Sequence, residues 1–246
     1  MALYDSIGQT YRVTRRPDPR IAAAIWSALG DAASVVNVGA GAGSYEPGQT
    51  IAAIEPSRVM IAQRPAGAAP AVQAVAERIP LHDRCADAAL AVLSAHHWSD
   101  VAAGVAEMRR IARRRLVFFT WWPQDVTSFW LLSEYLPEAA RVDAVMAERI
   151  QVLARLLPGA EVRPVRVPHD CADGFAAAYW RRPGAYLDPA VRAGISILAR
   201  TGDDALRGGL SRLADDLRTG RWQDNHADLM QLDSLDVGYR LVITAP

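Results

Sequence analysis

The sequence predicts an α/β protein with a doubly wound, mostly parallel sheet and a helical cap. Segments typical of strands and helices alternate with short connections through about residue 122, which favours a parallel sheet covered by helices. The run 87–95, DAALAVLSA, is continuously apolar, as expected for a strand buried on both faces. A long helical excursion between two late strands then indicates a cap over the carboxyl edge of the sheet, where such folds bind ligands.

The individual elements follow from local patterns. The first helix is expected at 18–30, and Gly30 ends it. One face of this helix carries the apolar residues Ile21, Ile25, Trp26 and Leu29. The second strand, TIAAI, ends on Glu55, and Ser57 caps the next helix. The other expected elements are strands at 35–38, 71–75, 87–95, 115–122, 161–168 and 238–246, a helix at 100–112, and mostly helical segments at 124–157 and 173–230, the last with a helix start at Asp173.

The chain is expected to form a single domain over residues 1–246. Its core comprises about 1–123, 158–171 and 236–246. The cap comprises about 124–157 and 173–232, because these segments lie between late strands and show no strand pattern of their own. A chain of 246 residues suits one such domain.

Composition excludes several classes of protein. The 27 basic and 27 acidic residues give a formal net charge of zero, so no overall field favours nucleic acid or an anionic membrane. No apolar run of about 18 residues predicts a transmembrane span, and residues 1–20 lack the apolar stretch of a secretory signal. The two cysteines, Cys85 and Cys171, form neither a disulfide framework nor a zinc motif. We therefore expect a soluble cytoplasmic protein with no metal; its oligomeric state is left open.

A glycine loop directly follows the first strand. Gly39, Gly41 and Gly43 form a G-x-G-x-G pattern, whereas a dinucleotide fingerprint would require glycine at the position of Ser44. Glycines here allow the backbone to turn tightly and to contact a ligand. Glu55 ends the second strand, where its carboxylate can accept both ribose hydroxyls. The combination indicates a ligand that contains adenosine.

Several ordered motifs resemble the class I S-adenosylmethionine (SAM)-dependent methyltransferases, especially the small-molecule group called methyltransferase type 11. These motifs are YDSIGQTYRVTRR (4–16), VVNVGAGAG (35–43), IAAIEPS (51–57), AERIPLHDRCADAALA (76–91) and SAHHW (94–98). The resemblance covers about residues 4–122 and implies a Rossmann-like core with an antiparallel final strand, SAM as cofactor and S-adenosylhomocysteine as product. It assigns cofactor contacts to Tyr11, Arg15, Asn37, Gly39, Ala40, Gly41, Gly43, Glu55, Pro56, Ala76, Glu77 and Ser94.

Two positions depart from the family pattern. Asn37 stands where the family usually has an acid that orders the glycine loop. Val75 stands where many members have an aspartate that binds the adenine amino group. Adenine would then be held by backbone groups and apolar packing near Ala76 and Glu77.

Methyl transfer requires mainly that a nucleophile be aligned with the methyl group, and a base helps when the acceptor must lose a proton. His96 and His97 end the fourth strand and are the candidate catalytic residues, with structural packing as the alternative. Candidate residues for a small-molecule acceptor, each of which ordinary core packing also explains, are Trp121, Trp122, His169, Tyr179 and Trp180.

The basic run RRIARRR (109–115) is best explained as the solvated end of a helix before the fifth strand. Two other functions stay open. One is a non-catalytic protein of the same fold that binds a ligand or a partner, favoured by Asn37 and Val75. The other is a nicotinamide-dependent oxidoreductase, disfavoured by the glycine spacing. An RNA methyltransferase is disfavoured by the neutral charge and by the lack of an appended binding domain.

Overall fold

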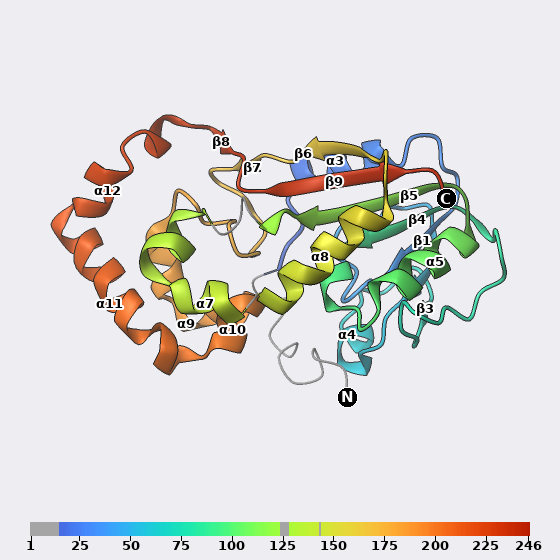
Figure 1. The fold of residues 1–246 in the computed structure, drawn as a ribbon, viewed down its shortest axis with the longest axis horizontal. Coiled ribbons are helices and arrows are strands. Elements are labelled where there is room, and N and C mark those ends of the chain that lie inside the picture. The colour runs from blue at the N-terminus through green and yellow to red at the C-terminus, as the bar shows by residue number, and fades with distance from the viewer. Residues whose placement is uncertain (1–14, 124–127, 143) are drawn as a thin grey trace.

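The computed structural model describes residues 15–123, 128–142 and 144–246 and is built around a seven-stranded sheet (Figure 1). Its strands are β1 (Val35–Val38), β2 (Thr50–Ile54), β3 (Ala71–Val72), β4 (Ala86–Val92), β5 (Ala112–Trp121), β6 (Glu161–Pro164) and β9 (Tyr239–Thr244). They lie in the order β3-β2-β1-β4-β5-β9-β6, and β9 is antiparallel to both β5 and β6. The predicted mostly parallel sheet with an antiparallel final strand is confirmed.

Helices cover both faces of this sheet. In Figure 1, α5 (Val101–Ile111) and α8 (Ala144–Leu156) lie in front of the strands, and α3 (Pro19–Ala28) lies behind them. The short α4 (Arg58–Ala62) follows β2, and Ser57 caps it by accepting the Met60 N–H, as predicted. Cover on both sides leaves every residue of β1 buried, which accords with three valines among its four residues.

Helix α3 begins where the sequence indicates. The Asp18 carboxylate caps it by accepting the Arg20 N–H, and Pro19 occupies the first turn. Ile21 and Ile25 are buried, as expected. Trp26 was wrongly placed on the same face: it lies about 100° further around the helix than Ile25, is 45% exposed, and donates its indole N–H to the Tyr45 carbonyl.

Several strand predictions need correction. The fifth strand begins at Ala112, three residues earlier than expected, so Arg113, Arg114 and Arg115 lie in β5 and not at the end of a helix. The third strand is limited to Ala71–Val72, and the fourth ends at Val92 because Leu93 takes a left-handed backbone conformation with φ +47°. The predicted strand 161–168 is two strands in two sheets. β6 pairs with β9, whereas β7 (Val167–Pro168) pairs with β8 (Ser234–Leu235) in a separate antiparallel ribbon.

The remaining helices gather beyond the carboxyl ends of the parallel strands, at the left of Figure 1. They are η2 (Leu131–Tyr135, a π-helix), α7 (Pro137–Val142), η3 (Pro183–Leu187), α9 (Pro189–Ala193), α10 (Ser196–Thr201), α11 (Asp203–Thr219), α12 (Arg221–Asn225) and η4 (Leu229–Gln231). Helix α8 instead packs on α5 and on η1 (Ala95–His97). Segment 124–157 therefore contributes to both groups of helices.

The helix start predicted at Asp173 is wrong. Residues 172–181 form bends and turns, and the Asp173 carboxylate is buried and accepts hydrogen bonds from other parts of the chain. No helix within the described residues is long and apolar enough to cross a membrane.

Candidate active site

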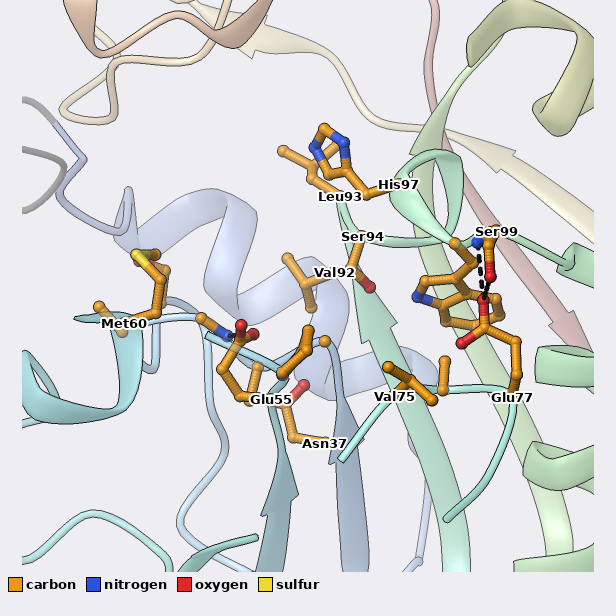
Figure 2. Close-up of a pocket in the computed structure, with 18 of the residues that line it drawn as sticks. Asn37, Glu55, Met60, Val75, Glu77, Val92, Leu93, Ser94, His97 and Ser99 are labelled. Carbon is orange, nitrogen blue, oxygen red and sulfur yellow. Dashed lines mark hydrogen bonds between the residues drawn. The ribbon is translucent and has the colours of Figure 1, made fainter. Parts of the chain in front are cut away.

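A cavity of about 320 Å³ opens at the carboxyl ends of β1, β2 and β4. Figure 2 shows the side chains that surround it, with Glu55 and Met60 on one side and Glu77 and Ser99 on the other. This is the edge at which doubly wound sheets bind ligands. The lining residues are Arg15, Asn37, Gly39, Ala40, Gly41, Ala42, Ser44, Glu55, Pro56, Met60, Val75, Ala76, Glu77, Val92, Leu93, Ser94, His97, Trp98 and Ser99.

The glycine loop forms the floor of this cavity. The N–H groups of Gly39 and Ala40 both donate to the Ile54 carbonyl, so the loop is held against the end of β2. Gly39 has φ +69°, and a Cβ there would lie 2.5 Å from the Ser94 Cβ, closer than two carbons can pack. Ser94 in turn donates its hydroxyl to the Val38 carbonyl at 2.9 Å. The ends of β1 and β4 therefore approach each other only because position 39 has no side chain.

The Glu55 carboxylate points into the cavity from the end of β2 (Figure 2). One oxygen accepts the Gly41 N–H and the other accepts the Ser57 N–H, each at 2.8 Å. An ionised carboxylate is a strong acceptor, which suits it to ligand hydroxyls at this place. The two backbone donors hold the group in place before a ligand binds.

Asn37 lies below the loop in a buried polar cluster that explains its departure from the family pattern. Its Nδ2 donates to the Glu46 Oε2 at 3.1 Å, and the Arg64 Nη2 donates to both Glu46 oxygens at 2.7 and 2.9 Å. An acid at position 37 would bring two carboxylates together, whereas an amide can donate. Glu46 thus places a negative charge beside Asn37, and the sequence contains no local motif that marks it.

The opposite end of the cavity is formed by residues 75–77. The Val75 side chain, 46% exposed, lines the cavity at the position where the family resemblance leads one to expect an acid. The Glu77 Oε1 accepts the backbone and hydroxyl hydrogens of Ser99 and the Asp100 N–H at 2.6 to 3.1 Å. Burial raises the pKa of Glu77, but these hydrogen bonds outweigh it and hold the pKa below its usual range. The Glu77 carboxylate therefore joins this loop to the start of α5.

The two histidines lie on η1, with ring centroids 4.0 Å apart, and face different cavities. His97 borders the large cavity, whereas His96 borders a smaller one and lies 5.8 Å from the Trp121 ring. Within the described part of the chain the buried His96 Nδ1 has no hydrogen-bond partner. The Arg149 Nη1 donates to the His96 carbonyl at 3.1 Å.

Both imidazoles are neutral near pH 7. Burial, followed by the nearby Arg200, Arg149 and Arg15 guanidinium groups, lowers the pKa of His97 to about 3. Burial also lowers the pKa of His96 well below its ordinary value, followed by the effects of His97 and of the same guanidinium groups. A neutral imidazole can accept a hydrogen bond, but these surroundings disfavour a protonated one.

The smaller cavity has a volume of about 60 Å³ and lies between the sheet edge and the helices beyond it. Arg15 and Leu93 border both cavities, so the two adjoin. Leu93 is held at this junction in its left-handed conformation by a 2.7 Å hydrogen bond from its N–H to the Phe119 carbonyl. The other lining residues are mostly apolar: His96, Trp121, Phe175, Ala176, Gly194, Ile195, Ser196, Ile197 and Tyr239.

Of the predicted acceptor residues, the structure brings only Trp121 to these two cavities, as judged from the residues it describes. Trp122 borders a separate cavity beside Ile150. His169 lies next to the β7–β8 ribbon, where its N–H donates to the Asp233 carbonyl. Tyr179 packs on Tyr186 and Arg182, and Trp180 is fully buried with its indole N–H donated to the Val167 and Pro168 carbonyls.

The predicted cofactor residues lie closer together than the predicted acceptor residues. All of them in the described chain line the large cavity except Gly43, which borders a neighbouring hollow with Arg15 and Arg16. Tyr11 lies outside the described residues. Motif reasoning missed Met60 and Leu93 in the large cavity, and Phe175, Ile195 and Tyr239 in the small one, because these residues come from segments without a motif.

Comparison with known proteins agrees with this geometry. The model of a methyltransferase domain family matches residues 36–119. A solved structure from Anabaena variabilis, described as a methyltransferase of an antibiotic biosynthesis pathway, is 33% identical with a TM-score of 0.84 over 96% of this chain and 99% of that one. The fold is also shared by a type II methyltransferase from Anaeromyxobacter dehalogenans (21% identity, TM-score 0.53, 94% and 97% covered) and by a geranyl diphosphate methyltransferase solved with its substrate and sinefungin (14%, 0.51, 92% and 78%). No curated protein sequence matches.

The chain belongs to the class I SAM-dependent methyltransferases. It is therefore an enzyme that uses SAM as its methyl donor. The cavity fits this cofactor on structural grounds: position 39 admits no Cβ, the Glu55 carboxylate is held toward the cavity by backbone donors, and the buried Asn37 Oδ1 has no partner within the described residues.

Proposed function

We propose that this enzyme methylates a small-molecule acceptor whose reacting end enters the 60 Å³ cavity beside His96. The observation that supports this is the junction of the two cavities at Arg15 and Leu93. A pocket of this size, lined by apolar and aromatic side chains with one unsatisfied imidazole nitrogen, suits one end of a metabolite. It would not admit a folded protein surface.

In this proposal the large cavity holds SAM along its length. Glu55 and Pro56 would contact the ribose, and the loop 39–42 would lie against the methionyl part with Arg15 near its carboxylate. Residues 75–77 would enclose the adenine, with Val75 packing on the ring in place of an acid. For Tyr11, a contact with the cofactor is proposed from the family resemblance alone.

When bound, the cofactor supplies an electrophilic methyl group, so the chain's own residues need mainly to bind, orient and exclude water. Trp121, Phe175 and Tyr239 would hold the acceptor in apolar surroundings. The neutral His96 can accept an O–H or N–H hydrogen bond from it and thereby orient the nucleophile. Because burial and then three nearby guanidinium groups disfavour an imidazolium, we assign His96 and His97 a positioning role and only a weak role as bases.

We further propose that the helices beyond the carboxyl ends of the strands, within the segments 124–157 and 173–232, act as a cap that carries the acceptor specificity. Phe175, Ile195 and Ile197 of the small cavity come from the second segment. The Anabaena relative is described as part of an antibiotic biosynthesis pathway, and a natural-product acceptor for this chain accords with the small apolar cavity.

The proposal is tested with isotope-labelled SAM and a panel of small phenols, amines and carboxylic acids, with RNA and denatured protein as competing acceptors. Label should appear only in small molecules. Ala176→Phe, which fills the small cavity, should abolish transfer while leaving the affinity for S-adenosylhomocysteine unchanged. The matched control is Ala172→Phe, which changes an exposed alanine of the same segment. Label in RNA or protein alone, or full activity of Ala176→Phe, refutes the acceptor site.

A further inference from the structure

A buried carboxylate connects the cap segment to the mouth of both cavities. Asp173 is 1% exposed and lies in the turns that follow β7. Its Oδ1 accepts the Arg15 Nε at 2.7 Å and the Gly174 N–H at 2.7 Å, and its Oδ2 accepts the Arg15 Nη2 at 3.3 Å. Two nitrogens of one guanidinium are therefore bound to one carboxylate across 158 positions of sequence.

The Tyr45 hydroxyl adds a third connection, from just after the glycine loop. It donates to the Asp173 Oδ2 at 2.8 Å and accepts the Asp18 N–H at 3.3 Å. Burial, together with the neighbouring Asp173 carboxylate, raises the pKa of Tyr45 far above its ordinary value. The phenol therefore keeps its proton and remains a donor to Asp173 at any working pH.

Asp18 completes the cluster from the start of α3. Its Oδ2 accepts the Ala172 N–H at 3.0 Å and the Arg20 Nη2 at 2.7 Å. Burial raises the pKa of Asp18, but Arg20 and the backbone donors outweigh it and lower the pKa to about 2. The backbone of residues 172–174 is thus bound on both sides, by Asp18 and through Asp173, to elements that lie beside the glycine loop.

A buried ion pair is a weak source of stability, because desolvation of the two charges offsets most of their attraction. Such an ion pair is more effective at fixing the position of one of its two groups. Here that group is the Arg15 guanidinium, because Arg15 borders both cavities. The two residues after Gly174, Phe175 and Ala176, line the acceptor cavity. The ion pair therefore lies between a cofactor contact and an acceptor contact.

We propose that Asp173 is a positioning residue that holds the Arg15 guanidinium for the methionyl carboxylate of the cofactor and so couples cofactor binding to the placement of Phe175 and Ala176. This inference rests on the proposed function of Arg15. The carboxylate of Asp173 fixes two guanidinium nitrogens in advance, so less conformational freedom is lost when the cofactor binds.

The test compares two ligands by calorimetry: S-adenosylhomocysteine, which carries the amino-acid end, and 5′-methylthioadenosine, which lacks it. Asp173→Asn keeps the size of the side chain and its ability to accept from Tyr45, but removes the charge that orients Arg15. We expect about tenfold weaker binding of S-adenosylhomocysteine, the order of one charge-assisted hydrogen bond. Affinity for 5′-methylthioadenosine should change by less than about twofold.

Two further variants complete the design. Arg15→Gln should produce the same selective loss, and adding Asp173→Asn to it should cause no further loss if Asp173 acts through Arg15. Asp170→Asn is the matched control, because its carboxylate binds Arg20 at the exposed surface three residues away and should leave both affinities unchanged. If Asp173→Asn does not fold, Tyr45→Phe removes one bond to Asp173 and should give a smaller selective loss.

Parallel losses for both ligands, no loss, or tighter binding of S-adenosylhomocysteine by Asp173→Asn would each overturn the positioning role. Additive effects of the Arg15 and Asp173 substitutions would do the same. Failure of the proposed function looks different: the wild-type protein would then bind both ligands equally well, or Arg15→Gln would not distinguish them.

Discussion

Replacing Asn37 with aspartate restores the acid that the family usually carries, and the structure predicts that the change is harmful. The Asn37 Nδ2 lies 3.1 Å from the Glu46 Oε2, so the introduced oxygen would take the place of a donor beside a carboxylate. Two unit charges at 3.1 Å repel by about 5 kcal/mol at an effective dielectric constant near 20. Arg64 carries a single positive charge, which already neutralises Glu46 and cannot fully neutralise a second carboxylate as well.

The penalty should depend on pH in a defined direction. The like charge raises the folded-state pKa of the introduced acid above the value of about 3.9 that it has when unfolded. The folded variant can escape the repulsion by binding a proton, which costs about 1.4 kcal/mol for each pH unit above 3.9. At pH 5 the destabilisation is therefore limited to about 1.5 kcal/mol, whereas at pH 8 it approaches about 5 kcal/mol. The loss grows as pH rises.

Urea denaturation followed by circular dichroism at pH 5, 6.5 and 8 measures this difference. Asn225→Asp, on the exposed end of α12, is the matched control and should show no such trend. The reasoning is refuted if the free energy of unfolding of Asn37→Asp at pH 8 is within about 1 kcal/mol of wild type, or if its deficit is the same at pH 5. Improved cofactor binding by Asn37→Asp would favour the family pattern over this local explanation.

Three further predictions concern the same site. Glu55→Gln should weaken S-adenosylhomocysteine binding by at least about tenfold, the order of one charge-assisted hydrogen bond; unchanged calorimetric affinity in a folded variant would remove Glu55 from the site. Gly39→Ala should lower the melting temperature and the cofactor affinity because of the 2.5 Å approach to Ser94, whereas Gly48→Ala, where a Cβ meets nothing within 4 Å, should do neither. Because the pKa of His97 is lowered in the folded state, the unfolded chain binds that proton more readily as pH falls below about 6.5. Wild type should therefore lose more stability than His97→Gln between pH 6.5 and 4, and equal losses in urea denaturation would contradict the burial of a neutral imidazole.

The cofactor side of the site could be predicted from sequence because its geometry is local. Gly39 and Glu55 each follow a strand directly, and parallel neighbouring strands bring their carboxyl ends together. Spacing along the chain therefore determines proximity in space. The same logic placed Ser94 and the two histidines at this edge.

The acceptor side could not be predicted in this way. Phe175, Ile195 and Tyr239 meet in one cavity, yet they come from a turn, a helix cap and a strand whose spacing in sequence has no fixed relation to distance. Trp180 was a candidate ligand contact because of its residue type, but it is buried and its indole N–H is donated to backbone carbonyls. Asp173 has the local pattern of a helix cap, and only tertiary structure shows that its partner is Arg15.

The β7–β8 ribbon has a consequence for how such an enzyme diversifies. The chain leaves the main sheet at Pro164 and returns to it at Tyr239, and between these points Val167 and Leu235 are paired with each other. Residues 169–233 thus form an insertion whose two ends are adjacent, the arrangement in which a segment can be lengthened, shortened or exchanged with little effect on the surrounding fold. Lineages could in this way acquire new acceptors by changing the insertion beyond residues 172–174, which are bound to Arg15 and Asp18, while the strands that carry Gly39 and Glu55 keep their register and their cofactor.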